Sequence, residues 1–141
     1  MMAETGTRPI PVPTPETQPF WDGCARGELL LQRCRQCGTV WHPPSPLCPN
    51  CLSTDFEWTP ASGRGTVYTY SVVHHAFRPL WEELVPYIVA VIELAEGPHL
   101  VSNLVDIAPE DVRIDMEVAV AFHPVSETIS LPFFGPATGA R

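Results

Sequence analysis

The stretch CRQCGTVWHPPSPLCPNC, residues 34–51, holds two Cys-x-x-Cys pairs with ten residues between them. Each pair can bring two sulfurs to one ion across a tight turn, and two facing turns complete the tetrahedral thiolate shell of structural Zn²⁺ sites. Gly38 lets the backbone curl after the first pair, and Pro49 stiffens the second. The spacing therefore predicts a structural zinc ion bound by Cys34, Cys37, Cys48 and Cys51.

Two disulfides or redox-active dithiols would use the same four cysteines. Disulfides need an oxidising compartment, and residues 1–18 form a Pro-rich polar lead without the apolar core of a signal peptide. No stretch approaches the roughly 20 apolar residues that span a bilayer. We therefore favour zinc, and we expect a cytoplasmic protein with no membrane partner. A shell of four cysteines leaves no open position for a catalytic water, so the ion should hold structure.

Composition limits the size of the fold and the kind of partner. The chain has 141 residues, 45% of them apolar, with 17 prolines and nine glycines. This length and composition fit one domain, or a small module held together by a metal ion plus a small barrel. In either case the secondary-structure elements should be short. All eight basic residues are arginines, and sixteen acidic residues bring the formal net charge to −8. Proteins that grip a phosphate backbone usually carry a basic stripe, and none is visible here.

The N-terminal part reads as a helix followed by a zinc ribbon. Thr14 or Thr17 can cap a short helix that runs to about residue 25, with Gly27 just past its end. Cys24 is then a small apolar packing residue. Short strands around the cysteine turns complete the ribbon, and we expect them at residues 29–33, 39–41 and 56–58.

The chemistry of the chain changes at residues 60–65, Pro-Ala-Ser-Gly-Arg-Gly. Beyond this boundary β-branched and aromatic residues predict five strands, at residues 66–73, 87–94, 100–105, 117–122 and 129–133. The run 87–94 is nearly all apolar and suits a strand covered on both faces, whereas residues 77–84 suit one helical turn or a loop. Five strands without a long helix predict a mostly β protein with an OB-fold barrel. The expected divisions are a flexible leader (1–13), helix and ribbon (14–60), OB-fold (61–136) and tail (137–141).

The ordered set of motifs resembles one family, the zinc-ribbon plus OB-fold proteins associated with acyl-CoA enzymes and long catalogued as a domain of unknown function. The resemblance covers residues 16–136 and implies a rubredoxin-like ribbon. At Asp115 that family usually has glycine, which suggests a different turn there. The motifs that carry the resemblance are Phe20-Trp21, Leu31-Gln32-Arg33-Cys34-x-x-Cys37-Gly38, Pro43-Pro44, Cys48-Pro49-x-Cys51, Gly63-x-Gly65-x-Val67, Pro86-Tyr87-x-Val89-Ala90, Leu94, Gly97-Pro98 and Pro132-Phe133.

The resemblance implies a role in lipid metabolism rather than a reaction of the chain's own. Proteins of this family are accessory subunits of thiolase-superfamily enzymes, which include thiolases, acyltransferases and aldolases acting on CoA thioesters. Some are fused or bound to hydratases in steroid side-chain degradation. The barrel is expected to help bind the acyl-CoA.

Two groups of residues are candidates for these contacts. A partner interface would use aromatic side chains beyond those that a core requires, although they could instead pack on the chain's own core or plug the barrel ends. They are Phe20, Trp21, Phe77, Trp81, Phe133 and Phe134. CoA phosphates would suit the forked donors of arginine beside permissive glycines, although solvated arginines are common. Those candidates are Gly63, Arg64, Gly65 and Arg78.

Other function classes have weaker support. A stand-alone module that binds a ligand or single-stranded nucleic acid could stack bases on Tyr68, Tyr70 or Tyr87, but the acidic charge disfavours it. For a self-contained enzyme, His74 and His75 are the tempting pair, yet adjacent strand residues point to opposite faces. Neither a nucleophile with a spaced base nor an activator for the fifth cysteine is apparent, so we expect no catalysis by this chain alone. A histidine that serves a site shared with a partner stays open.

Overall fold

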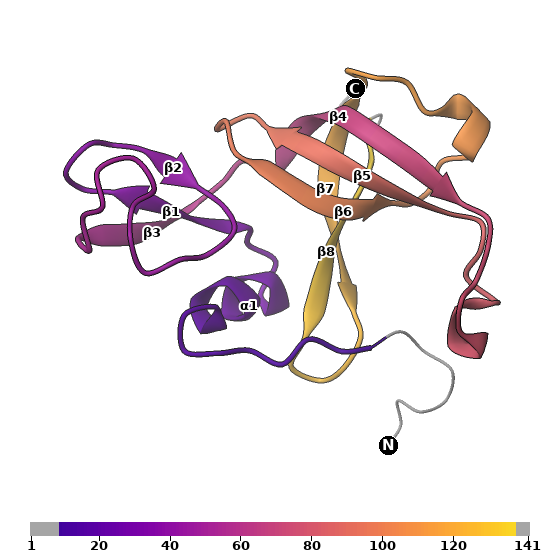
Figure 1. Cartoon of the computed structure of the whole chain (residues 1–141), viewed down its shortest axis with the longest axis horizontal. Coiled ribbons are helices and arrows are strands. Elements are labelled where there is room, and N and C mark those ends of the chain that lie inside the picture. The colour runs from indigo at the N-terminus through magenta and orange to yellow at the C-terminus, as the bar shows by residue number, and fades with distance from the viewer. Residues whose placement is uncertain (1–8, 138–141) are drawn as a thin grey trace.

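A computed structural model describes residues 9–137 of the chain (Figure 1). A three-stranded sheet in the order β2-β1-β3 precedes a closed barrel in the order β4-β5-β6-β8-β7. The short helix α1 lies below and between these two units in Figure 1, and it contacts β1, β7 and β8. The expected mostly β fold, with a short helix, a ribbon and a five-stranded barrel, is confirmed. Residues 1–8 of the expected leader and 138–141 of the expected tail lie outside the described residues.

Helix α1 spans Gln18–Ala25 and packs into the chain's own core. Thr17 occupies the N-cap position, and Gly27 beyond the C-terminus has a φ of 85°, as a helix-ending glycine should. Phe20 is only 5% exposed and Cys24 only 1%. The expectation that Phe20 faces a partner is therefore wrong, because the helix turns this side chain toward the junction of ribbon and barrel.

The ribbon consists of β1 (Leu30–Cys34), β2 (Val40–Trp41) and β3 (Phe56–Pro60), with β1 in the middle. Its central polar residue, Gln32, is 2% exposed. The Gln32 carboxamide donates to the Ser45 carbonyl oxygen at 2.8 Å and accepts from the Ser45 amide at 2.9 Å. This paired bond ties the proline-rich loop between the two cysteine turns to the middle strand.

The barrel strands are β4 (Arg64–Val73), β5 (Tyr87–Leu94), β6 (His99–Leu104), β7 (Glu117–Pro124) and β8 (Ser130–Pro136). Two short 3₁₀ turns interrupt the connections, η1 (Pro79–Trp81) and η2 (Pro109–Asp111). Neighbouring strands are antiparallel except β6 and β8, which are parallel and share the single register pair Leu104 with Phe134. The barrel is thus closed by its weakest seam between β6 and β8.

Burial along β5 corrects one expectation. Ile88, Ala90, Ile92 and Leu94 are buried, while the residues between them are half-buried or exposed. The strand is therefore not covered equally on both faces, because a barrel has one packed interior and the apolar run serves it at every second position.

The turn before β7 bears on the one departure from the family's pattern. Asp115 has a φ of 71°, and its amide donates to the Val67 carbonyl at 2.8 Å. Aspartate is one of the few residues that visits this left-handed region routinely. Asp115 therefore makes the kind of turn that a glycine would make, and no different turn is needed.

Within residues 9–137, the structure contains no helix of the length and apolar character that crossing a membrane requires.

Candidate functional site

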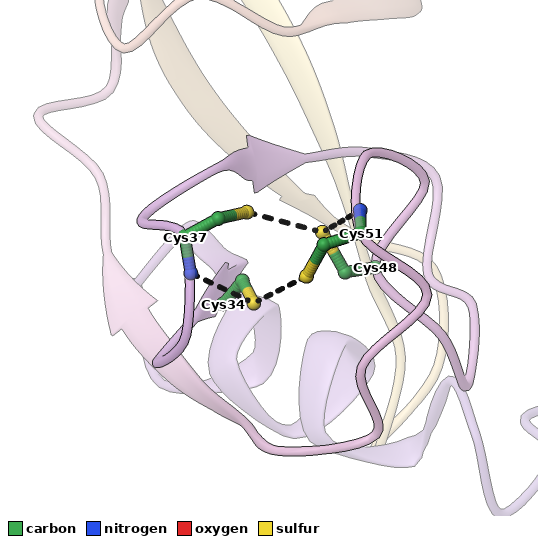
Figure 2. A group of neighbouring side chains, drawn as sticks. All are labelled: Cys34, Cys37, Cys48 and Cys51. Atoms are coloured by element: carbon green, nitrogen blue, oxygen red, sulfur yellow. Dashed lines mark hydrogen bonds between the residues drawn. The ribbon is translucent and has the colours of Figure 1, made fainter.

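The four cysteines converge at one end of the ribbon, as Figure 2 shows. The Sγ atoms of Cys34 and Cys51 are 3.6 Å apart, as are those of Cys37 and Cys48, and all four lie within 4.8 Å of one another. A tetrahedral zinc with Zn–S bonds of 2.3 Å would have sulfurs about 3.8 Å apart. The sulfurs are also well beyond the disulfide bond length of about 2.05 Å. The arrangement therefore fits a structural zinc ion and contains no disulfide.

The two turns are built alike, which explains why the sulfurs meet. The amides of Gln36 and Cys37 point at the Cys34 sulfur, at 3.3 and 3.4 Å. The corresponding amides after Cys48 point at its sulfur, at 3.4 and 3.5 Å. Such donors stabilise thiolates and fix the orientation of metal ligands. The first cysteine of each pair is fully buried and the second is exposed.

The charges of the thiolates also call for a cation. The Thr39 hydroxyl at 3.1 Å and the Asn50 carboxamide at 3.5 Å lower the pKa of Cys37 to about 5. Although the Ser53 amide lowers the pKa of Cys51, the neighbouring sulfurs raise it to about 12. One thiol therefore keeps its proton beside the other sulfurs until a divalent ion replaces that proton. Zinc bound here would hold the two turns together.

The remaining candidates for sulfur or nitrogen chemistry are not ligands. Burial raises the pKa of the Cys24 thiol to about 12, which leaves it a packing residue, as expected. His42 lies in the proline-rich loop with its ring 5.2 Å from that of Phe20, and burial lowers its pKa to about 4. His74 and His75 are both exposed beyond the end of β4. None of these four residues forms a pair of nucleophile and base with another of them.

An apolar cavity of about 380 Å³ lies between α1, the loop after β2, β6 and β8. It gathers three of the aromatic residues singled out from the sequence, namely Phe20, Trp21 and Phe133. Phe134, the neighbour of Phe133, is instead 0% exposed in the barrel core, so its expected place at a partner interface is wrong. Alternation along β8 sends the two phenylalanines to opposite faces.

The cavity also includes residues that the sequence did not single out for a site. They come from the loop after β2 and from β6 and β8, and they are His42, Pro43, Pro44, Leu100, Val101, Ser102, Asn103, Leu131 and Pro132. The signal available in the sequence was the stiff Pro43-Pro44 pair, which does not indicate by itself what it faces.

The residues expected at CoA phosphates do not form one site. Arg64 and Gly65 line a second cavity, of about 640 Å³, together with Glu93 and Glu117. The negative charges of these carboxylates would repel an anionic ligand such as a CoA phosphate. Arg78 follows the other end of β4, a ten-residue strand that spans about 30 Å.

Packing accounts for both glycines around Arg64. A Cβ on Gly63, whose φ is 82°, would lie 2.7 Å from the Val120 side chain. A Cβ on Gly65 would lie 2.6 Å from the Glu93 carbonyl oxygen on the neighbouring strand β5. The barrel itself therefore requires glycine at these positions, without any ligand.

The connection between β4 and β5 carries the other two aromatic candidates, at the end of the barrel away from the ribbon (Figure 1). Phe77 is 88% exposed, and the ring of His75 lies beside its ring, with the centroids 4.9 Å apart. Trp81 is half-buried, and its ring centroid is 5.8 Å from that of Tyr87. Phe77 is thus the most exposed large apolar side chain in the described part of the chain.

Comparison with known proteins agrees with this architecture. Residues 21–57 match the family model "ChsH2, rubredoxin-like zinc ribbon domain", and residues 58–123 match "ChsH2, C-terminal OB-fold domain". A solved structure titled "Ltp2-ChsH2(DUF35) aldolase" contains a chain that is 40% identical, with a TM-score of 0.81, over 90% of this chain and 98% of that one. The sequence prediction of this fold and family is confirmed.

Three curated relatives differ in how much of their length they share with this chain. A DUF35 domain-containing scaffold protein of Methanocaldococcus jannaschii is 47% identical over 70% of this chain and 70% of its own. A probable enoyl-CoA hydratase alpha subunit of Thermomonospora curvata is 41% identical over 92% of this chain and 40% of its own. The benzoylsuccinyl-CoA thiolase subunit BbsA of Geobacter metallireducens is 32% identical over 66% of this chain and 60% of its own.

The chain therefore spans less than half of the hydratase subunit but most of the scaffold protein. Both family models, the shared cysteine ribbon and the following barrel agree on one assignment. The protein belongs to the DUF35 family, whose ChsH2-type members join a rubredoxin-like zinc ribbon to an OB-fold.

Proposed function

We propose that this chain is a non-catalytic accessory subunit that binds and stabilises a thiolase-superfamily enzyme acting on acyl-CoA thioesters. The observation that carries the proposal is the similarity to the DUF35 chain of an aldolase complex, at 40% identity over 90% of this chain. Relatives named as a thiolase subunit and a hydratase subunit agree with it. The site chemistry agrees too, since four cysteines close the metal shell and leave no open position for catalysis.

The finer features follow from the same role. Phe77 and Trp81, at the exposed connection between β4 and β5, are our candidates for the partner interface. Trp21 and Phe133 line the apolar cavity between α1, β6 and β8. The exposed Arg78 is a better candidate for CoA phosphates than Arg64, which has carboxylates beside it.

The proposed location is the cytoplasm, because a reducing compartment keeps zinc-binding thiolates from forming disulfides. The substrates would belong to lipid degradation, with steroid side chains among them.

The test is co-purification from the native host, with mass spectrometry of the bound proteins and metal analysis of the same sample. We expect a thiolase-superfamily enzyme and about one zinc per chain. A lone zinc-loaded chain would contradict the proposal. It would favour the alternative, a stand-alone module, and CoA and single-stranded oligonucleotides would then be titrated.

A further inference from the structure

We propose that the cavity between α1, residues 42–44, β6 and β8 binds the acyl group of a CoA thioester. The inference rests on the proposed function for the chemical class of the ligand, and it assigns the place where the chain holds that ligand. The nucleotide part of CoA would remain outside the cavity.

The position of the cavity follows from the weak seam of the barrel. Strands β6 and β8 share only the register pair Leu104 with Phe134 within residues 9–137. Two residues earlier, the Ser102 hydroxyl donates to the Pro132 carbonyl at 2.7 Å, which replaces a ladder bond with a side-chain bond. The cavity lies along this part of the seam, under α1. Its volume of about 380 Å³ falls within the range of small-molecule sites.

The lining selects an uncharged, apolar ligand. None of the residues that line the cavity carries an acidic or basic side chain other than His42. Burial lowers the pKa of His42 to about 4, so its ring is neutral at pH 7. Phosphates would lose their hydration here without gaining a counter-charge. A hydrocarbon skeleton would gain the burial of its surface.

The His42 ring can orient the ligand. Within the described residues no hydrogen bond or ion pair joins the His42 ring, whose packing contact is with Phe20. A neutral imidazole has one donor and one acceptor, which suits the carbonyl or hydroxyl group of an acyl chain. Apolar walls with a few placed polar groups are what small-molecule sites have in common.

The shape of the cavity favours a small molecule over a flat protein surface. Its floor includes Phe20 and Phe133, which are 5% and 7% exposed, whereas Val101 at its rim is 68% exposed. A recess of this kind can receive a chain of carbon atoms. Because the ribbon, the helix and the barrel each supply a wall, a bound acyl group would also tie these parts together and raise the melting temperature.

The test measures binding of acetyl-, butyryl-, hexanoyl- and octanoyl-CoA, and of CoA itself, to the zinc-loaded full chain by calorimetry. Val101→Trp fills the rim of the cavity. Ile114→Trp is the matched control, because Ile114 is also β-branched and exposed, at 53%, and does not line the cavity. We expect affinity to rise about fourfold for each methylene that enters the cavity. We also expect Val101→Trp to weaken octanoyl-CoA binding at least tenfold and Ile114→Trp to leave it unchanged.

The assignment would be overturned if the wild type bound CoA and octanoyl-CoA with equal affinity. It would also be overturned if Val101→Trp and Ile114→Trp bound octanoyl-CoA equally well. Capture of the partner enzyme by the wild type and by Val101→Trp is measured in parallel. Suppose that the wild type and Val101→Trp both capture the enzyme, and that both bind octanoyl-CoA equally well, as the free chain and in the complex. The cavity assignment then fails and the accessory-subunit proposal stands. Acyl-dependent binding without any capture would support the cavity and refute the accessory role. If Val101→Trp loses capture and no acyl chain binds, the cavity is a protein docking site.

Discussion

Cys37 and Cys51 respond in opposite directions to the same cluster of sulfurs. Hydrogen bonds from Thr39 and Asn50 lower the pKa of Cys37 to about 5, whereas the neighbouring sulfurs raise that of Cys51 to about 12. The cluster is thus arranged to bind a cation, which takes the place of the retained proton. At the scale of single residues, the sulfurs would hold the cysteine turns together through the ion that they bind, because the core around them is small.

Cys34→Ser should release the zinc and unfold the ribbon, because structural zinc contributes on the order of 10 kcal/mol to local folding. We expect zinc content near zero, rapid amide exchange in β1 and β2, and loss of partner capture. Cys24→Ala, which removes a buried thiol that is not a ligand, should keep the zinc. A Cys34→Ser chain that lost zinc and still captured the partner would refute the role of the ribbon in docking.

His42 should make stability depend on pH. Burial lowers its pKa from 6.5 to about 4, so the unfolded chain binds a proton between these values and the folded chain does not. Stability from the neutral ring is therefore complete above pH 6.5 and falls as the pH drops toward 4, by up to about 3 kcal/mol. Urea unfolding of His42→Phe against wild type across pH 4–7.5 checks this. The difference should grow in favour of the variant at low pH.

At the scale of elements, a single side chain fastens the long loop of the ribbon. Gln32 lies in the middle strand β1 and bonds both backbone groups of Ser45 across thirteen positions of sequence. The loop has three prolines in residues 42–46, which remove amide donors, so few other backbone bonds can hold it. The same loop forms one wall of the apolar cavity.

Gln32→Leu should therefore cost about 1–3 kcal/mol, because the Ser45 amide and carbonyl would lose their partners in a half-buried position. Chemical unfolding of the zinc-loaded chain measures the loss, and octanoyl-CoA binding should weaken with it. Gln36→Leu, at an exposed position of the first cysteine turn, should cost less than about 1 kcal/mol. Equal costs for both variants would contradict the fastening role of Gln32.

At the scale of the whole molecule, one continuous core joins α1 and β1 to the barrel. Phe20 and Leu31 from the N-terminal part and Phe134 from β8 belong to the same buried cluster. The ribbon and the barrel are distinct sheets, yet they are not independent in packing. A substitution at the cavity between them should consequently change the stability of both the ribbon and the barrel.

Two phenylalanines should separate stability from assembly. Phe134→Ala should lower the free energy of unfolding by about 3–5 kcal/mol, because the ring is fully buried in the core. Phe77→Ala should leave the melting temperature nearly unchanged but weaken partner capture, because the ring is 88% exposed. Thermal unfolding and a pull-down of the partner are measured on both variants. If Phe77→Ala captured the partner as well as the wild type does, the connection between β4 and β5 would not be part of the interface.

The cysteine spacing, the capping residues around the helix and the strand pattern were sufficient to predict the ribbon, the short helix and the barrel. Metal ligands two residues apart meet by local turn geometry, and alternation along a strand is a local property. The sequence also singled out aromatic residues and arginines as candidates for partner and CoA contacts, without indicating which of them come together.

Only the tertiary structure decided how those residues are used. The apolar cavity is formed by residues from four separate segments, such as Trp21, His42, Val101 and Leu131, whose convergence no local pattern encodes. Whether an aromatic side chain is exposed depends on the neighbour that covers it. The sequence by itself therefore determined the metal centre and the architecture, which rest on short-range geometry, and the tertiary structure decided the cavity and the free surfaces, which rest on long-range packing.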